Sequence, residues 1–132
     1  MGRNEVALLY AFEDGRMAVI KHVLAGMKVR VRVVEPAQYR QPVGFLVGME
    51  GIPGGAPEFT GPAFEEPMLV MYGFSSKRID ELLKRLKRAG AGRIGLKAVV
   101  TQYNCKWNSI QLHAQLSQER RAMGEAMAKK TE

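Results

Sequence analysis

The 132-residue sequence predicts an α/β fold made of two β-α-β-α repeats, which form one small, mostly parallel sheet with packed helices. Apolar runs of strand length alternate with segments of helical periodicity, and such alternation favours parallel pairing through right-handed crossovers. The same order of elements occurs twice, on either side of a segment rich in proline and glycine. The chain is 46% apolar and 25% charged, as in ordinary globular proteins, and we expect residues 1–132 to form a single domain.

The first half contains two predicted strands, each followed by a predicted helix. Residues 6–12 (VALLYAF) form an apolar run of strand length. Asp14 is suited to cap the helix that follows, and Gly26 lies where that helix should end. Residues 28–34 (KVRVRVV) alternate like a strand, and Pro42 suits the first position of a further helix.

The second half repeats this order. Residues 68–74 (MLVMYGF) predict a strand, and a leucine-rich helix follows over residues 76–89. Residues 93–100 (RIGLKAVV) predict the next strand, and a capping-box pattern starts the last helix. The residues that suit the two helix starts are Ser75 or Ser76 for the first, and Asn108 with Gln111 for the second.

An aromatic pair also recurs, which favours an internal duplication. Tyr10 and Phe12 match Tyr72 and Phe74 at an offset of 62 residues. We therefore expect repeats at 5–50 and 67–120, a Pro/Gly-rich loop over 51–67, and a C-terminal tail over 121–132. Because Phe59 and Phe64 lie within the loop, we expect it to be pinned to the body at two points.

The strand at residues 28–34 predicts where its neighbours lie. Its valines share one side and its basic residues share the other, so one side of the strand should face water. This pattern predicts an edge strand, or helices gathered on one face in a ferredoxin-like α+β fold. The edge strand, or the methionine-containing helix expected over residues 43–49, could support a homodimer.

Positive charge gathers in the second half. The net charge is +7, and residues 77–106 hold nine basic and two acidic side chains. A helix with a solvated basic side gives the same count, and a phosphate-binding surface is the functional alternative. The candidate nucleic-acid contacts on the helix over residues 76–89 are Lys77, Arg78, Lys84, Arg85, Lys87 and Arg88.

The sequence offers little for catalysis or metal binding. Cys105 is the single cysteine, and His22 and His113 are the only imidazoles. These residues match no metal-ligand spacing and no dithiol pair, so we predict no metal, no cofactor and no assigned catalytic residue. An enzyme dependent on the Cys105 thiol is the least favoured alternative.

A small anion site can be predicted from the sheet architecture. Ligands of open parallel sheets bind beyond the carboxyl ends of the strands. Those ends would present Ser75, Ser76 and Lys77 from one strand, and Thr101 and Asn104 from another. Helix capping and turn formation are the structural alternatives for these residues.

The second half also resembles a known family. Its segment 68–74, the leucine-rich helix after Ser75, and the string Leu96-Lys-Ala-Val-Val-Thr101 with Asn104 and Trp107 carry the likeness. They resemble a small bacterial family, family 3783 of the domains of unknown function, over about residues 67–120. The first half joins this family only through the duplication. The resemblance implies a bacterial cytosolic protein and assigns no activity.

Together these patterns predict a non-enzymatic cytoplasmic module that binds a protein partner or a small anionic ligand. Sequence-independent nucleic-acid binding through residues 76–89 is the alternative. No apolar run reaches the ~18 residues of a membrane span, and the start of the chain lacks the layout of a signal peptide. A single cysteine fits a reducing compartment.

Overall fold

The computed structural model describes residues 4–130, and the side chains of residues 4–123. Its sheet has the strand order β2-β1-β3-β4. Two of the three pairings are parallel, β1 with β2 and β3 with β4, and the central pair β1–β3 is antiparallel. The strands are β1 (Val6–Tyr10), β2 (Arg30–Val33), β3 (Met68–Tyr72) and β4 (Leu96–Val99).

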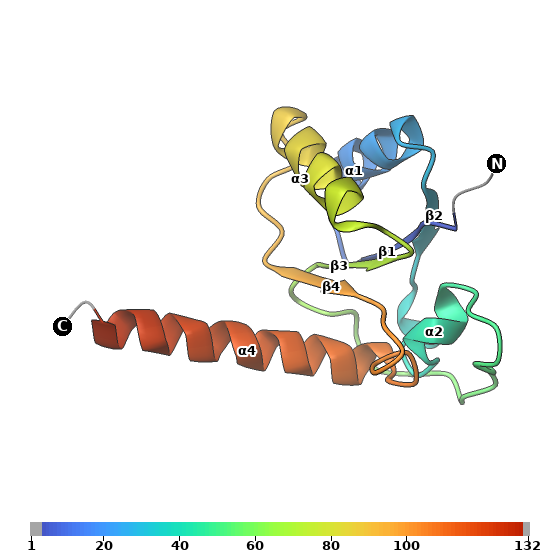
Figure 1. Ribbon diagram of the computed structural model, residues 1–132. Coiled ribbons are helices and arrows are strands. Elements are labelled where there is room, and N and C mark those ends of the chain that lie inside the picture. The colour runs from blue at the N-terminus through green and yellow to red at the C-terminus, as the bar shows by residue number, and fades with distance from the viewer. Residues whose placement is uncertain (1–3, 131–132) are drawn as a thin grey trace.

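Helices cover both faces of this sheet (Figure 1). The first face carries α1 (Asp14–Gly26) and α3 (Ser76–Arg88), and the second carries α2 (Val43–Leu46) and α4 (Ser109–Lys130). A 3-10 turn, η1 (Pro36–Gln38), precedes α2. The predicted α/β fold with two β-α-β-α repeats is therefore confirmed. The ferredoxin-like alternative, with helices mostly on one face, does not describe it.

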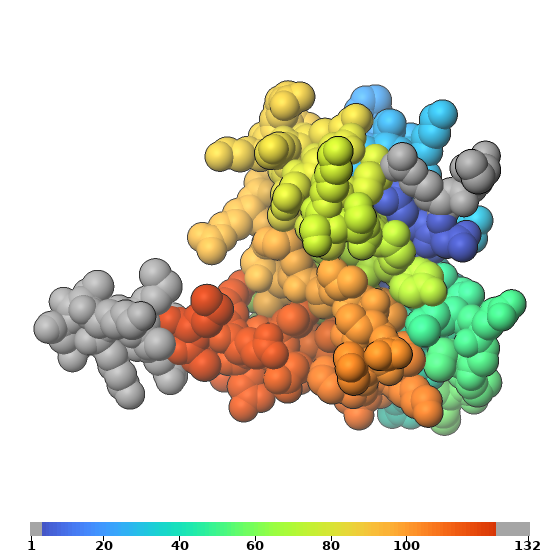
Figure 2. Space-filling view, in the orientation of Figure 1, coloured from blue at the N-terminus to red at the C-terminus, as the bar shows by residue number. Residues whose placement is uncertain are grey.

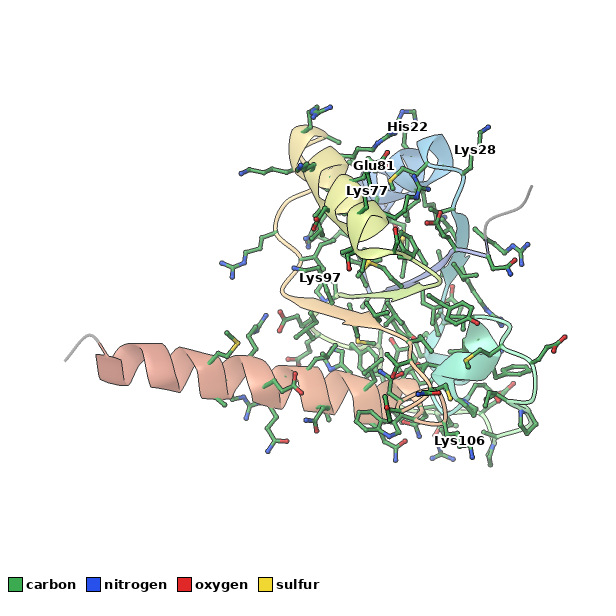
Figure 3. The ribbon with its side chains drawn as sticks, viewed as in Figure 1. His22, Lys28, Lys77, Glu81, Lys97 and Lys106 are labelled. Atoms are coloured by element: carbon green, nitrogen blue, oxygen red, sulfur yellow. The ribbon has the colours of Figure 1, made fainter. Side chains whose placement is uncertain are left out.

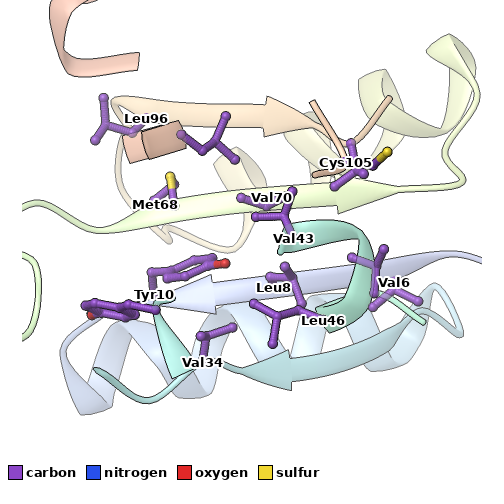
Figure 4. Close-up of a cluster of buried hydrophobic side chains, with 14 residues drawn as sticks. Val6, Leu8, Tyr10, Val34, Val43, Leu46, Met68, Val70, Leu96 and Cys105 are labelled. Atoms are coloured by element: carbon purple, nitrogen blue, oxygen red, sulfur yellow. The ribbon is translucent and has the colours of Figure 1, made fainter. Parts of the chain in front are cut away.

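Alternation along the central strands builds two separate cores. Ala7 and Leu9 of β1 point toward α1 and α3, whereas Leu8 and Tyr10 point toward α2 and α4. Figure 4 shows the second of these cores, in which side chains from α2 and the strands interdigitate. Every residue of β1 is buried, because the strand lies inside the sheet and is covered on both faces.

The two halves have the same order of elements at corresponding positions. Val6 corresponds to Met68 and Asp14 to Ser76, an offset of 62, whereas Arg30 corresponds to Leu96, an offset of 66. Ala11 (φ 62°) and Gly73 (φ 80°), also 62 residues apart, both have a left-handed backbone conformation. The antiparallel pairing of β1 with β3 then relates the halves by an approximate two-fold axis near the pair Leu8–Val70.

The strand β2 lies at the sheet edge, as its alternation predicts. Arg30 and Arg32 are exposed, while Val31 packs against the core beneath α1. Arg32 lies over α2, where it donates hydrogen bonds to Leu46 O (3.2 Å) and Gln38 Oε1 (2.9 Å).

Two phenylalanines pin the segment 51–67, which confirms that expectation. The Phe64 ring lies between Tyr39 (centroids 4.1 Å apart) and His113 (3.9 Å apart). The Phe64 amide donates to the Tyr39 hydroxyl at 3.2 Å, and the Phe59 amide donates to Ala37 O at 3.2 Å. This long segment therefore packs as part of the second core.

Two element boundaries differ from the expected ones. Residues 121–130, expected as a tail, continue α4, which extends past the edge of the sheet (Figure 1). The helix expected to reach residue 49 ends at Leu46 after about one turn, because Gly48 (φ 85°) adopts the left-handed conformation that ends helices.

Candidate functional site

The layer formed by α1 and α3 carries the charge of the molecule. Residues 14–28 and 76–93, which make up these helices and the turns after them, hold ten basic and three acidic residues. Their net charge of +7 equals that of the whole chain. In Figure 3, His22, Lys28 and Lys77 project on this side, and Lys106 lies on the opposite side. We call this surface the α1–α3 face.

The sequence of α3 explains why its basic residues face water. Leu82 and Leu86 are buried against the sheet, and most of the lysines and arginines lie at exposed positions of the helix. Ser75 caps the helix, since its Oγ accepts a hydrogen bond from the Arg78 amide at 3.2 Å. The side chains of α3 project from the molecular surface in Figure 2. The exposed basic residues of α3 are Lys77, Lys84, Arg85, Lys87 and Arg88.

Arg78 has a different environment from the other basic residues of α3. Its guanidinium forms two hydrogen bonds with the carboxylate of Glu5 (2.7 and 2.8 Å) and one with Met27 O (2.7 Å). The side chain of Glu5 is 2% exposed and that of Arg78 is 15% exposed. Hydrogen bonding to Glu5 raises the pKa of Arg78 further above its usual range. Arg78 thus has a structural role. Its guanidinium is occupied by Glu5 and Met27, so it is not freely accessible to a nucleic acid, as the predicted contact would require.

Arg16 plays the matching part on α1. Its Nε donates to Ala91 O at 2.7 Å and its terminal nitrogen donates to Arg93 O at 2.5 Å. Arg16 and Arg78 are each the third residue of their helix, and each reaches the turn that follows the other helix. These two arginines therefore fasten α1 and α3 into one layer.

The first helix and the turn after it add polar and basic residues that the predicted contacts did not include. Lys21, His22 and Lys28 are exposed, and His22 lies beside Arg85 and Arg88 of α3 in a shallow hollow of about 310 Å³. These residues are far from α3 in the sequence, so a count along the chain does not combine the two groups. The available signal was the location of Lys21 and His22 at polar positions of the predicted helix 14–26, with Lys28 just after its end.

The predicted anion-site residues lie in two different places. Ser75 and Lys77 line a hollow of about 520 Å³ that also contains the carboxylates of Glu5 and Glu81. Ser76 is the exposed first residue of α3.

Thr101 and Asn104 close a turn after β4. The Asn104 side chain accepts a hydrogen bond from the Thr101 amide (2.8 Å) and donates one to Val99 O (3.0 Å). Neither residue lines the hollow at the start of α3. The structure therefore gives these two side chains a turn-forming role.

The cysteine and the two histidines are separated. Cys105 is buried with its Sγ 3.6 Å from Gln102 O, His113 stacks on Phe64, and His22 lies on the exposed side of α1. Within residues 4–123, no three histidine, cysteine or acidic side chains gather as metal ligands would. No helix among the described residues is long and apolar enough to cross a bilayer.

The fold and its surface define a small α/β module with one strongly basic helical face. Residues 67–123 match the model of a family described as a domain of unknown function (DUF3783), which confirms the predicted resemblance. This span runs from just before β3 into α4, so it covers the second β-α-β-α unit. No curated protein and no solved structure matches the chain significantly.

Proposed function

We propose that this chain is a non-enzymatic module whose α1–α3 face binds the phosphate backbone of nucleic acids without reading their sequence. The observation that carries the proposal is the confinement of a net +7 charge to this one layer. Lysine and arginine side chains that neutralise phosphates release counterions, and this release supplies most of non-specific binding.

The arrangement of the face supports a backbone contact. Lys21 comes from α1 and Lys28 from the turn after it, and Lys84, Lys87 and Arg88 come from α3. The cations therefore spread over two packed helices and one adjoining turn. None of these five residues takes part in a salt bridge among the described side chains. Their charges are therefore available to an external polyanion.

The absence of base-reading groups favours binding without sequence choice. Neither α1 nor α3 contains a tyrosine, phenylalanine or tryptophan, the residues that stack on unpaired bases. Both helices also pack with their apolar sides on the sheet, and the exposed side of α3 carries mainly flexible basic side chains. We expect similar affinities for mixed RNA and mixed DNA.

Charge reversal tests this proposal. The double variant Lys84→Glu/Arg88→Glu should lose binding to mixed-sequence RNA at low salt, measured by fluorescence anisotropy. Wild-type affinity should fall steeply with added salt, with a log–log slope of about −0.7 to −0.9 per phosphate contacted.

The matched control is Arg40→Glu/Lys106→Glu, which makes the same change of charge at exposed residues outside the α1–α3 face. It should keep most of the wild-type affinity. If both double variants lost the same affinity for RNA, the net charge alone would explain binding. That result would contradict binding through the α1–α3 face. An absence of binding by the wild type at low salt would also contradict the proposal.

A further inference from the structure

A second site lies beside α3, between its C-terminal half and the segment that leads into β4. Here the surface forms a pocket of about 570 Å³. Leu83, Leu86 and Ile94 provide its apolar lining, and Lys87, Arg93 and Lys97 provide its charge. Figure 3 shows Lys97 at the start of β4, on the side of the strand that faces α3.

The pocket is located where the two halves of the molecule differ. In the first half three residues, 27–29, link α1 to β2, whereas seven residues, 89–95, link α3 to β4. Gly90 (φ 74°) and Gly92 (φ 80°) shape the longer link, and both line the pocket. Arg16 holds this link in place through Ala91 O and Arg93 O. The longer link thus forms one side of the pocket and is fixed there by Arg16.

The positive charge of the pocket is not neutralised by acidic residues in its lining. No acidic residue lines it, and no salt bridge among the described side chains involves Lys87, Arg93 or Lys97. The Lys97 ammonium donates to Ile94 O at 2.7 Å, which holds it at the pocket wall. Two other hollows contain acidic residues: Glu5 and Glu81 line the one at the start of α3, and Glu66 pairs with Arg120 in the one that Arg93 also lines. The hollow beside His22 has no acidic lining residue, but its Arg85 pairs with Glu81.

We infer that this pocket binds a small amphiphilic anion, meaning a carboxylate or phosphate monoester that carries an apolar body. The anionic group would meet the three cations. The apolar body would cover Leu83, which is half-buried, and the small exposed parts of Leu86 and Ile94. A purely inorganic anion would leave the apolar lining in water, and a neutral apolar molecule would leave the cations unmatched.

Calorimetric titration of the full chain with octyl phosphate, kept below its micelle concentration, tests this site. We expect saturable one-to-one binding and a rise in Tm with ligand concentration. Inorganic phosphate and 1-octanol, each at the same concentration, should give neither effect. Equal binding by inorganic phosphate, or no binding by octyl phosphate, would overturn the inference.

Two matched variants locate the site. Lys97→Ala should weaken octyl phosphate binding about tenfold, the effect of losing one charged hydrogen bond. The Tm of the free protein should fall only slightly, through loss of the hydrogen bond to Ile94 O, and the variant should remain folded. Lys106→Ala removes an exposed lysine outside the pocket and should leave the affinity unchanged. Equal affinities in the two variants would place the ligand elsewhere and overturn the inference.

An anionic lipid in a membrane has the same chemistry as a free amphiphilic anion, so either could be the natural ligand. Sedimentation with phosphatidylglycerol vesicles distinguishes membrane binding from binding of a free molecule. Binding to vesicles without binding to dispersed octyl phosphate would contradict a pocket for small molecules. Binding to dispersed octyl phosphate that depends on Lys97 supports it, with or without binding to vesicles.

Discussion

Arg78 illustrates how its surroundings decide what a basic residue does. In the sequence it is one of six basic residues on one helix, and nothing local sets it apart. In the structure it meets Glu5, which lies just before β1 and 73 positions earlier in the chain. A long-range ion pair of this kind is invisible to spacing rules. Its partner could be named only after β1 and β3 are placed side by side.

The pairing with Glu5 predicts a large effect on stability. Arg78→Ala should lower the free energy of unfolding by about 3 kcal/mol, because it removes the bidentate partner of a nearly buried carboxylate. Urea denaturation measures the change. Lys77→Ala, at the exposed neighbouring position, should change the same quantity by less than about 0.5 kcal/mol. Similar losses in both variants would show that the pair with Glu5 does not stabilise the fold.

Tyr10 predicts a loss of stability at alkaline pH. Burial raises the pKa of its hydroxyl well above the ordinary value near 10, against the opposing effect of its hydrogen bond with Ser109. The folded state therefore keeps a proton that the unfolded chain releases. The protonated Tyr10 hydroxyl therefore contributes its full share of the folding stability below pH ~10. This stability is lost as the pH rises further, because the unfolded chain then releases the proton.

Denaturation at pH 8 and pH 11 measures this effect. Wild type should lose about 1.4 kcal/mol more stability than Tyr10→Phe between these two values, since the variant has no hydroxyl to titrate there. Identical losses would contradict a raised pKa for Tyr10.

At the scale of elements, the two halves allow a direct internal comparison. Ala11 and Gly73 occupy equivalent turns after β1 and β3, and both have left-handed backbone. A side chain at Gly73 would place its Cβ 2.5 Å from Asn4 O, so the two turns differ in what they tolerate.

Reciprocal exchange at these positions should have opposite effects. Gly73→Ala should lower the free energy of unfolding by about 2 kcal/mol, through the left-handed conformation and the contact with Asn4. Ala11→Gly should raise it by about 0.5 kcal/mol, because relief of the left-handed conformation exceeds the entropy cost of glycine. Thermal denaturation gives both values. A change of the same sign in both variants would contradict the matched-turn interpretation.

Most elements could be predicted from the sequence, because their signals are local. Apolar runs give β1 and β3, alternating valines place β2 at an edge, and Ser75 marks the start of α3. The phenylalanines of the 51–67 segment also predict its attachment. The antiparallel meeting of the two halves could not be predicted, since it depends on contacts between strands about 60 residues apart.

The candidate sites show the same limit. The basic side of α3 was predictable from helical spacing, but its extension onto α1 required the packing of the two helices. The pocket beside Lys97 was only hinted at by a lysine within an apolar strand. Thr101 and Asn104 show the opposite case. Their position after a strand predicted a ligand site, but in the structure their side chains form a turn.

At the scale of the whole molecule, the sheet separates two surfaces of different charge. One carries α1 and α3 with a net charge of +7, and the remainder of the chain has no net charge. This polarity would steer a polyanion to one side and orient it there. Nucleic acid is therefore expected to bind on one face of the molecule only.

The most direct test is a nuclear magnetic resonance titration of the full chain with a short mixed-sequence RNA at low salt. The account predicts that amide shifts concentrate on the exposed residues of α1 and α3, and that they disappear when salt is raised. Shifts that concentrate on α2 and α4, or spread evenly over both faces, would contradict it.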